Sequence, residues 1–220
     1  MKKLFLLFAL GTLLMGCKNQ KSSTELFAME QQWQSNPSKG YDSTALEILN
    51  GYTSLAEDGD EDAKNKKTAF EAKLKKLVET DLGNLRRIDS LMALNQTSFN
   101  SILASSLSDG CLEFAGKHPC SAKAPNLLLK GADLQRALER FAESEKTLQS
   151  LIEKYPDFNK SDVALFFKAN MQLEQGKKGE AKKTFEKLVS QFPKSEFARD
   201  AQILLDNNLQ LPEVGKNQGK

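Results

Sequence analysis

The chain holds few of the residues on which most catalytic and metal sites depend. Its 220 residues include one histidine, three cysteines, one tryptophan and six prolines. A nucleophile elbow, a phosphate-binding loop and paired zinc-ligand motifs are all missing from the sequence. We therefore predict a protein that is not an enzyme, with no catalytic residue, no metal site, no cofactor and no small-molecule substrate.

An excess of one charge sign is also missing. Lysine and arginine number 31 against 29 aspartates and glutamates, and removal of residues 1–16 would delete Lys2 and Lys3 and leave 29 of each. Nucleic-acid recognition needs a basic face, so nucleic acid is not a predicted partner. Charged residues at 27% and hydrophobic residues at 40% are ordinary for a soluble helical protein.

The first residues hold an apolar run that is too short to span a membrane. Lys2 and Lys3 precede apolar residues 4–14, whereas a spanning helix needs roughly 20. A basic head, a short apolar run and small residues are typical of a secretory signal, which we place at 1–16. The run ends at Leu14-Met15-Gly16-Cys17. This ending resembles the lipobox of bacterial lipoproteins, although an ordinary secretion signal followed by a chance cysteine is the alternative.

The lipobox resemblance implies that Cys17 is acylated and begins the mature chain. Two or more acyl chains hold a protein stably at a membrane. In such families an aspartate just after the cysteine often retains the protein in the inner membrane, and Asn19 stands there instead. An acidic run of the kind that signals display on the cell exterior is also missing. We therefore expect outer-membrane attachment facing the periplasm, with residues 17–41 as a tether.

The other two cysteines, Cys111 and Cys120, are expected in an oxidising compartment where disulfides persist. A bridge needs Cα atoms within about 7 Å, whereas nine helical residues rise about 13 Å. Pairing therefore requires the helix to end early, near Gly116, and the question stays open. A zinc site at Cys111, His118 and Cys120 lacks a fourth ligand.

The strongest pattern in the chain is a repeat with a period of 37 residues, between 105 and 210. His118-Pro119, Tyr155-Pro156 and Phe192-Pro193 recur at this interval. Apolar residues also recur four, five and eight positions before each proline, which puts one stripe on a helix face in every copy. They are Cys111, Phe114 and Ala115, then Leu148, Leu151 and Ile152, then Phe185, Leu188 and Val189. Each proline is expected to end its helix.

The pattern predicts two complete helix-turn-helix units and one further helix. The first unit pairs residues 124–138 with 143–154, and the second pairs 162–175 with 178–191 around a turn at Gly176. A last helix is expected over 196–207, before a flexible tail at 211–220. Such arrays often end in an incomplete repeat.

A period in the mid-thirties built from paired helices is typical of tetratricopeptide repeats. The segment resembles the repeats of Gram-negative envelope lipoproteins, such as that of the β-barrel assembly machine and the periplasmic partner of Tol-Pal. The residues that carry this resemblance are Leu148, Leu151, Ile152, Tyr155, Pro156, Ala164, Phe167, Ala169, Gly176, Ala181, Phe185, Leu188, Phe192, Pro193, Ala198 and Ala201. It implies an all-α helix-turn-helix solenoid with an amino-terminal helical extension at 42–104.

The resemblance also implies a binding groove along the first helices of the repeats, where an extended or helical peptide docks. Carried over position by position, the groove residues are Asn126, Leu129, Asp133, Arg136, Val163, Phe166, Asn170 and Glu174. For each of them, a role in the core or on the plain surface is the alternative.

The amino-terminal half predicts further helices. One covers 42–57 behind a cap at Asp42 or Ser43, and another covers 63–82, with Gly83 interrupting it. Residues 57–62 form an acidic turn that is a poor calcium loop. A short helix is expected at 26–34, where Trp33 is either a packing residue or a partly exposed aromatic in the tether.

Two functions are compatible with the sequence. The first is a membrane-anchored, non-catalytic adaptor that binds an envelope protein or peptide segment during envelope assembly or maintenance. The alternative is a structural subunit packed permanently within a larger envelope complex. Such a subunit would expose an apolar stripe on its second helices and would aggregate when made alone.

Overall fold

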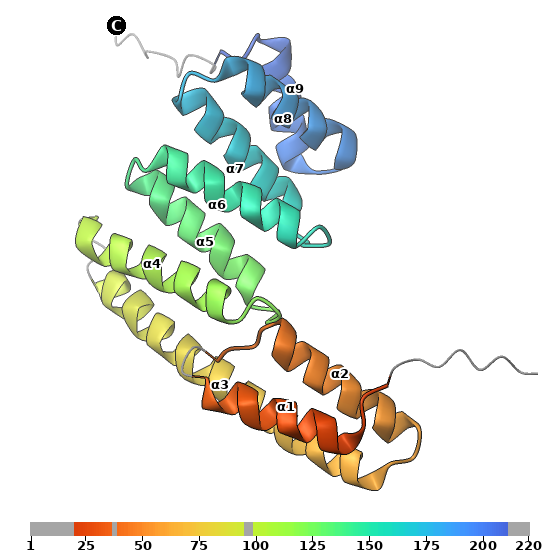
Figure 1. Ribbon diagram of the computed structural model, residues 1–220. Coiled ribbons are helices and arrows are strands. Elements are labelled where there is room, and N and C mark those ends of the chain that lie inside the picture. Colours follow the sequence, from red (N-terminus) through yellow and green to blue (C-terminus); the bar gives the residue numbers. More distant parts are fainter. Residues whose placement is uncertain (1–19, 37–38, 95–98, 211–220) are drawn as a thin grey trace, which may run out of the picture.

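A computed structural model describes residues 20–36, 39–94 and 99–210 (Figure 1). Within these residues the chain forms nine helices and no strand. The helices are α1 (Ser23–Ser35), α2 (Ser43–Glu57), α3 (Glu61–Leu94), α4 (Ser101–Lys117), α5 (Ala124–Ala137), α6 (Phe141–Lys154), α7 (Ser161–Glu174), α8 (Lys178–Gln191) and α9 (Glu196–Asp206). The predicted all-α solenoid is confirmed.

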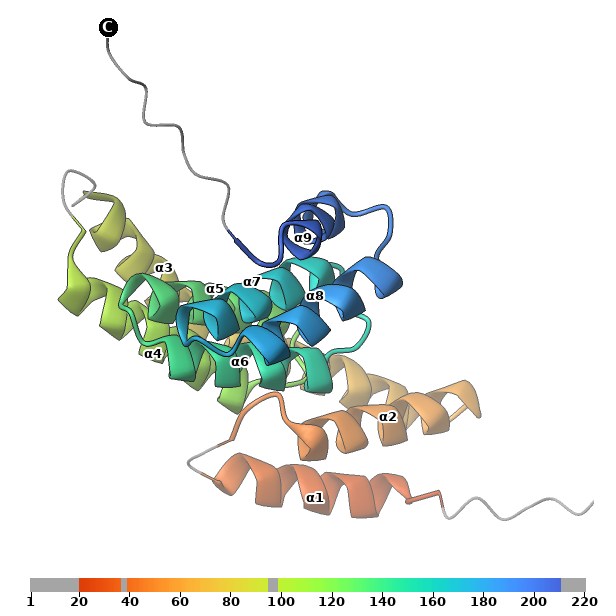
Figure 2. The same ribbon diagram turned by 90° about the horizontal axis from the view of Figure 1, so that it is seen from above.

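From α3 onward each helix packs against the next, and the first helices of the repeats also contact one another (Figures 1 and 2). Thus α5 touches α7, and α7 touches α9. The predicted repeat helices are found to within three residues at every end. The stack begins one helix earlier than the two complete units, because α4 packs on α5 as a second helix does.

The helix ends repeat with the predicted period of 37. His118, Tyr155 and Phe192 each follow a second helix, and their φ/ψ angles are −124°/54°, −131°/66° and −129°/54°. Each backbone N–H donates to the carbonyl four residues earlier. The proline that follows has no N–H to continue the helix, so all three copies leave the helix in the same way.

The turn inside each repeat also recurs. Gly176 has a φ of +72°, and Glu139, 37 residues earlier, has a φ of +59°. A left-handed backbone is open to glycine but costs other residues roughly 1–2 kcal/mol. The first repeat therefore carries strain at Glu139 that the second repeat avoids.

A buried polar pair joins the two helices of each repeat. The Thr147 hydroxyl donates to Gln135 at 2.9 Å, and the Thr184 hydroxyl donates to Gln172 at 2.7 Å. Both glutamines are almost fully buried, so the hydrogen bond satisfies an amide oxygen that burial would otherwise penalise. Hydrophobic periodicity did not predict this pair.

The amino-terminal helices differ from the prediction at Gly83. Helix α3 runs unbroken through this residue, so the predicted interruption is wrong. A Cβ placed at Gly83 would meet nothing within 4 Å, and glycine inside a helix costs only about 1 kcal/mol. Leu74 before it and Leu85 after it are both buried, and their packing outweighs that cost. The predicted α2, with Asp42 as its cap, is confirmed.

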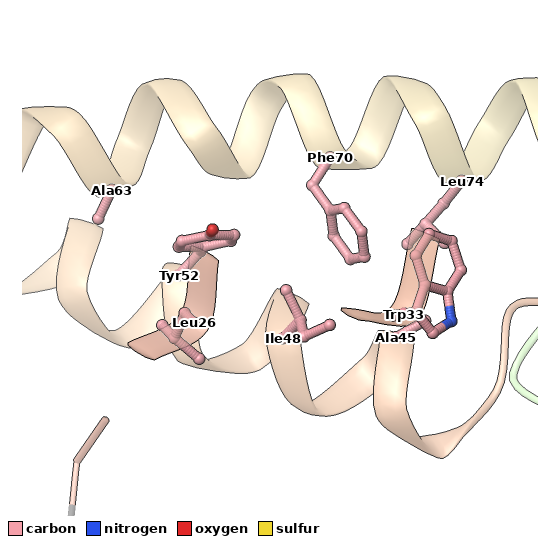
Figure 3. Close-up of a cluster of buried hydrophobic side chains, with 8 residues drawn as sticks. All are labelled: Leu26, Trp33, Ala45, Ile48, Tyr52, Ala63, Phe70 and Leu74. Carbon is pink, nitrogen blue, oxygen red and sulfur yellow. The ribbon is translucent and has the colours of Figure 1, made fainter. Parts of the chain in front are cut away.

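Helix α1 lies within residues assigned to the tether. Ser22 and Glu25 form a capping box at its start, and Leu26 and Trp33 are buried against α2 and α3 (Figure 3). The Trp33 and Phe70 rings meet edge-on at 5.3 Å. Residues 23–35 are therefore part of the folded body, and Trp33 is a packing residue. At the acidic turn, the Asp60 carboxylate accepts the Ala63 amide and begins α3.

Cys111 and Cys120 are free thiols. Helix α4 runs past Gly116 to Lys117, so the early end that a bridge requires does not occur. Burial raises the pKa of the Cys111 thiol to about 11. Cys17, the signal at 1–16 and the tail at 211–220 lie outside the described residues.

No helix of the described residues is both long enough and apolar enough to span a membrane.

Candidate protein-binding surface

The loop between α1 and α2 joins the amino-terminal helices to the repeat array. The Tyr41 amide donates to Nδ1 of His118 at 2.8 Å, and the Cys120 amide donates to the Tyr41 carbonyl at 3.0 Å. A Cβ placed at Gly40 would lie 1.7 Å from the Lys117 carbonyl oxygen. Only glycine fits this approach, and sequence reasoning did not find it.

His118 completes this junction. Because the Tyr41 amide donates to Nδ1, Nε2 carries the ring proton and donates to Asp81 at 2.5 Å. Lys117 also pairs with Asp81, at 3.0 Å. Burial raises the pKa of Asp81, but hydrogen bonds from His118 and Lys117 outweigh it and hold that pKa below its ordinary value. His118 is fully buried and both ring nitrogens are engaged, so it packs and positions the loop.

The first-helix face, formed by α5, α7 and α9, carries the predicted groove. Asn126, Arg136 and Glu174 are exposed on it. Asp133 is half-buried and accepts from Arg136 at 2.8 Å. These side chains, with the half-buried Val163, are available to a partner.

The remaining predicted groove residues serve the core in part. Leu129 packs against the cluster between α5, α6 and α7. The Phe166 ring lies 5.9 Å from that of Phe185 and 5.3 Å from that of Phe197. Asn170 donates to the Phe166 carbonyl within its own helix. Helical spacing placed these residues on the correct helices but did not show that α9 packs over Phe166.

A cavity of about 540 Å³ opens between α2, α3 and the start of α5. Tyr41, Leu49, Leu74, Val78 and Leu82 give it an apolar lining. The last three recur every four residues along α3, so they share one helix face. The sequence predicted that this face of α3 packs against other helices, but it did not predict the cavity.

The cavity borders the start of α5, because Ser121, Ala122 and Lys123 line it. Arg86 lines it, and Asp89, one turn further along α3, pairs with Lys130 of α5. Arg86 and Lys123 on its rim form no ion pair within the described residues, whereas Lys75 and Glu79 lie 4.0 Å apart. An apolar hollow with two unpaired cations suits a protein segment that carries an apolar side chain beside an acidic one.

A comparison with known protein families identifies two segments of the array. The family model for the tetratricopeptide repeat matches residues 127–157 and 164–195. These two segments are tetratricopeptide repeats. They cover α6 and α8 with most of the preceding helices, and tetratricopeptide repeats generally bind other proteins without catalysing a reaction. None of the curated proteins compared with the chain matches it.

Proposed function

We propose that the protein is a lipid-anchored adaptor of the bacterial cell envelope that binds a partner protein along its first-helix face. Attachment through Cys17 is proposed from the lipobox-like ending of the apolar run. Outer-membrane attachment is proposed because Asn19 and not an aspartate stands after Cys17, and the periplasmic face because no acidic run follows. The tetratricopeptide repeats support the binding role.

The cavity between α2, α3 and α5 is the observation that carries this proposal. Its lining reaches Lys123 at the start of α5, the helix that also exposes Asn126 and Arg136. A partner segment that lies along the first-helix face places an apolar side chain against Leu74, Val78 and Leu82. An acidic group beside that side chain meets Arg86 and Lys123.

Two neighbouring arginines of α3 test this surface. Arg86 lines the cavity, whereas Arg87 is also exposed and does not line it. We expect Arg86→Glu to lower partner recovery about tenfold in pull-downs from detergent-solubilised envelopes, because it replaces a charge-assisted contact with repulsion. Arg87→Glu, which makes the same charge change, is expected to retain the partner. Equal recovery of the partner by both variants would show that the partner does not bind at this cavity.

Attachment at Cys17 has a separate test. Cells grown with radioactive palmitate are expected to label the native chain and not Cys17→Ala, and the variant is expected in the soluble periplasmic fraction. Label that persists in Cys17→Ala would show that acylation occurs elsewhere.

The alternative, a subunit packed permanently in a complex, gains some support from the end of the α3–α4 pair. Leu94, Phe99 and Ile102 are highly exposed there. The second helices α6 and α8 expose no large apolar side chain, which favours the adaptor. A monodisperse monomer in sedimentation velocity is expected of the adaptor, and aggregation of the isolated chain is expected of the subunit.

A further inference from the structure

A second pocket lies on another side of α3, between α3 and α1. Its volume is about 300 Å³, at the lower end of small-molecule sites. Trp33 and Leu77 line it together with three lysines, Lys39, Lys73 and Lys76. Neither the repeat motif nor the proposed adaptor role uses it.

Trp33 contributes a buried donor without an acceptor. Its side chain is only 6% exposed, and its Nε1 is the one buried side-chain nitrogen or oxygen of the described residues with no hydrogen-bond partner. Figure 3 shows this nitrogen on the side of the ring that faces away from Ile48. A buried N–H is normally paired because an unpaired one destabilises the fold. The indole therefore requires an acceptor that the described chain does not supply.

The charges around the pocket favour an anionic ligand. Glu30 is buried and pairs with Lys73 at 2.7 Å, which neutralises one of the three lysines. Lys76 forms no ion pair within the described residues, and Lys39 reaches only the Gln34 carbonyl, at a long 3.5 Å. Lys39 also lies 6.0 Å over the Trp33 ring. Two cations thus remain for a ligand in a pocket that Trp33 also lines.

We propose that this pocket binds a phosphate group. A phosphate monoester carries close to two negative charges at neutral pH, which matches the two unneutralised lysines, whereas a carboxylate carries one. Its oxygens accept from Lys39, Lys76 and the Trp33 indole, which gives the buried N–H its partner. The group is that of a soluble phosphomonoester or of the lipid phosphatidic acid, since both are phosphate monoesters with the same terminal oxygens.

Trp33 makes the test specific, because it is the only tryptophan of the chain. The mature chain with Cys17→Ser, which carries no lipid, is titrated with inorganic phosphate at constant ionic strength while its fluorescence is recorded. We expect a saturable change in emission. Lys76→Ala is expected to weaken binding about tenfold, the loss typical of one charge-assisted hydrogen bond.

Lys75→Ala is the matched control. Lys75 is the neighbour of Lys76 and is also exposed, but it lines the cavity on the other side of α3. It is expected to leave the phosphate affinity unchanged. Equal weakening by both variants would show that overall charge attracts phosphate, and the pocket proposal would be wrong.

Trp33→Phe removes the indole N–H and keeps a ring against Phe70. Calorimetric titration is expected to show weaker phosphate binding, while urea denaturation without phosphate shows a midpoint no lower than that of the native chain. A fold that is retained and a phosphate affinity that is unchanged would refute the role of the indole.

Lipid vesicles separate the two sources of phosphate. Sedimentation with phosphatidic acid vesicles that depends on Lys76 and not on Lys75, without a response to inorganic phosphate, assigns the pocket to a lipid head group. A response to inorganic phosphate without such sedimentation assigns it to a soluble ligand, and both responses together show a phosphate site that accepts either source. Absence of both responses overturns the proposal. Each of these outcomes is independent of partner recovery in the Arg86 experiment.

Discussion

The close approach of Gly40 to the backbone of Lys117 gives the sharpest prediction. Gly40→Ala would put a methyl group 1.7 Å from the Lys117 carbonyl oxygen. Two backbone segments must then move apart, because neither is the end of a flexible side chain. The Tyr41–His118 and Cys120–Tyr41 hydrogen bonds are lost with that movement.

The expected magnitude follows from those two bonds. Each contributes about 1 kcal/mol, and a buried partner left unpaired costs roughly 1–3 kcal/mol. His118 is fully buried, so Nδ1 cannot turn to water. We expect Gly40→Ala to lower the free energy of unfolding by about 2–4 kcal/mol.

Urea denaturation provides the assay, with two probes. Fluorescence of Trp33 reports the α1–α3 cluster, and circular dichroism reports all helices. Gly116→Ala is the control, because its Cβ meets nothing within 4 Å although Gly116 adjoins Lys117. The control is expected to be stabilised by about 0.5–1 kcal/mol through helix propensity. A Gly40→Ala protein as stable as the native chain would refute the close approach.

A double variant tests the mechanism. His118→Phe introduces the residue that the third copy carries at Phe192 and removes the acceptor for Tyr41. If Gly40→Ala acts by opening this junction, the second change adds little to the first, because both remove the same bonds. Fully additive losses would show that the two residues act separately.

Three further predictions concern stability and reactivity. Gly176→Ala is expected to destabilise the chain by about 1 kcal/mol because Gly176 has a positive φ. Gly179→Ala lies in open space in the first turn of α8 and is expected to stabilise the chain by about 0.5–1 kcal/mol. Thermal denaturation distinguishes the two variants, and equal effects would contradict the left-handed turn at Gly176. Since the pKa of Asp81 is lowered in the folded state, its contribution is present above the ordinary value of 3.8 and lost as the pH falls through the lower folded value. Asp81→Asn should therefore lose less stability than the native chain in urea titrations taken from about pH 6 to about pH 2.5, and parallel curves would contradict this. Iodoacetamide is expected to modify the half-buried Cys120 before the buried Cys111, because burial raises the pKa of the Cys111 thiol to about 11. Mass spectrometry of the native chain checks the order of labelling, and simultaneous labelling of both thiols would contradict the prediction.

The repeat array was largely predictable because its signals are local. Apolar spacing and the proline after each second helix depend on residues close in sequence, and the common backbone angles at His118, Tyr155 and Phe192 follow from them. The groove was predicted less well. Spacing identifies the face of a helix but not how far the next helix covers it, and α9 covers part of Phe166.

The amino-terminal features escaped prediction because they depend on distant contacts. Residues 40 and 41 meet the end of α4 some 77 positions later, and no local pattern indicates such an approach. The unpaired Trp33 nitrogen is likewise visible only after α1, α2 and α3 are packed. Gly83 was misjudged for the same reason, since tertiary packing on both sides holds the helix through it.

Helix α3 explains why the amino-terminal helices and the repeats form one folded body. Its first half supplies Phe70 and Leu74 to the core shared with α1 and α2, and its second half supplies Leu85 to the core shared with α4. The turn of helix between these halves lines the cavity with Val78 and Leu82. A rigid helix shared by two cores cannot bend without disturbing both, and the junction at His118 fixes its angle to α4. The cavity between α2, α3 and the start of α5 is therefore held in shape from both sides, as the proposed docking of a partner segment requires.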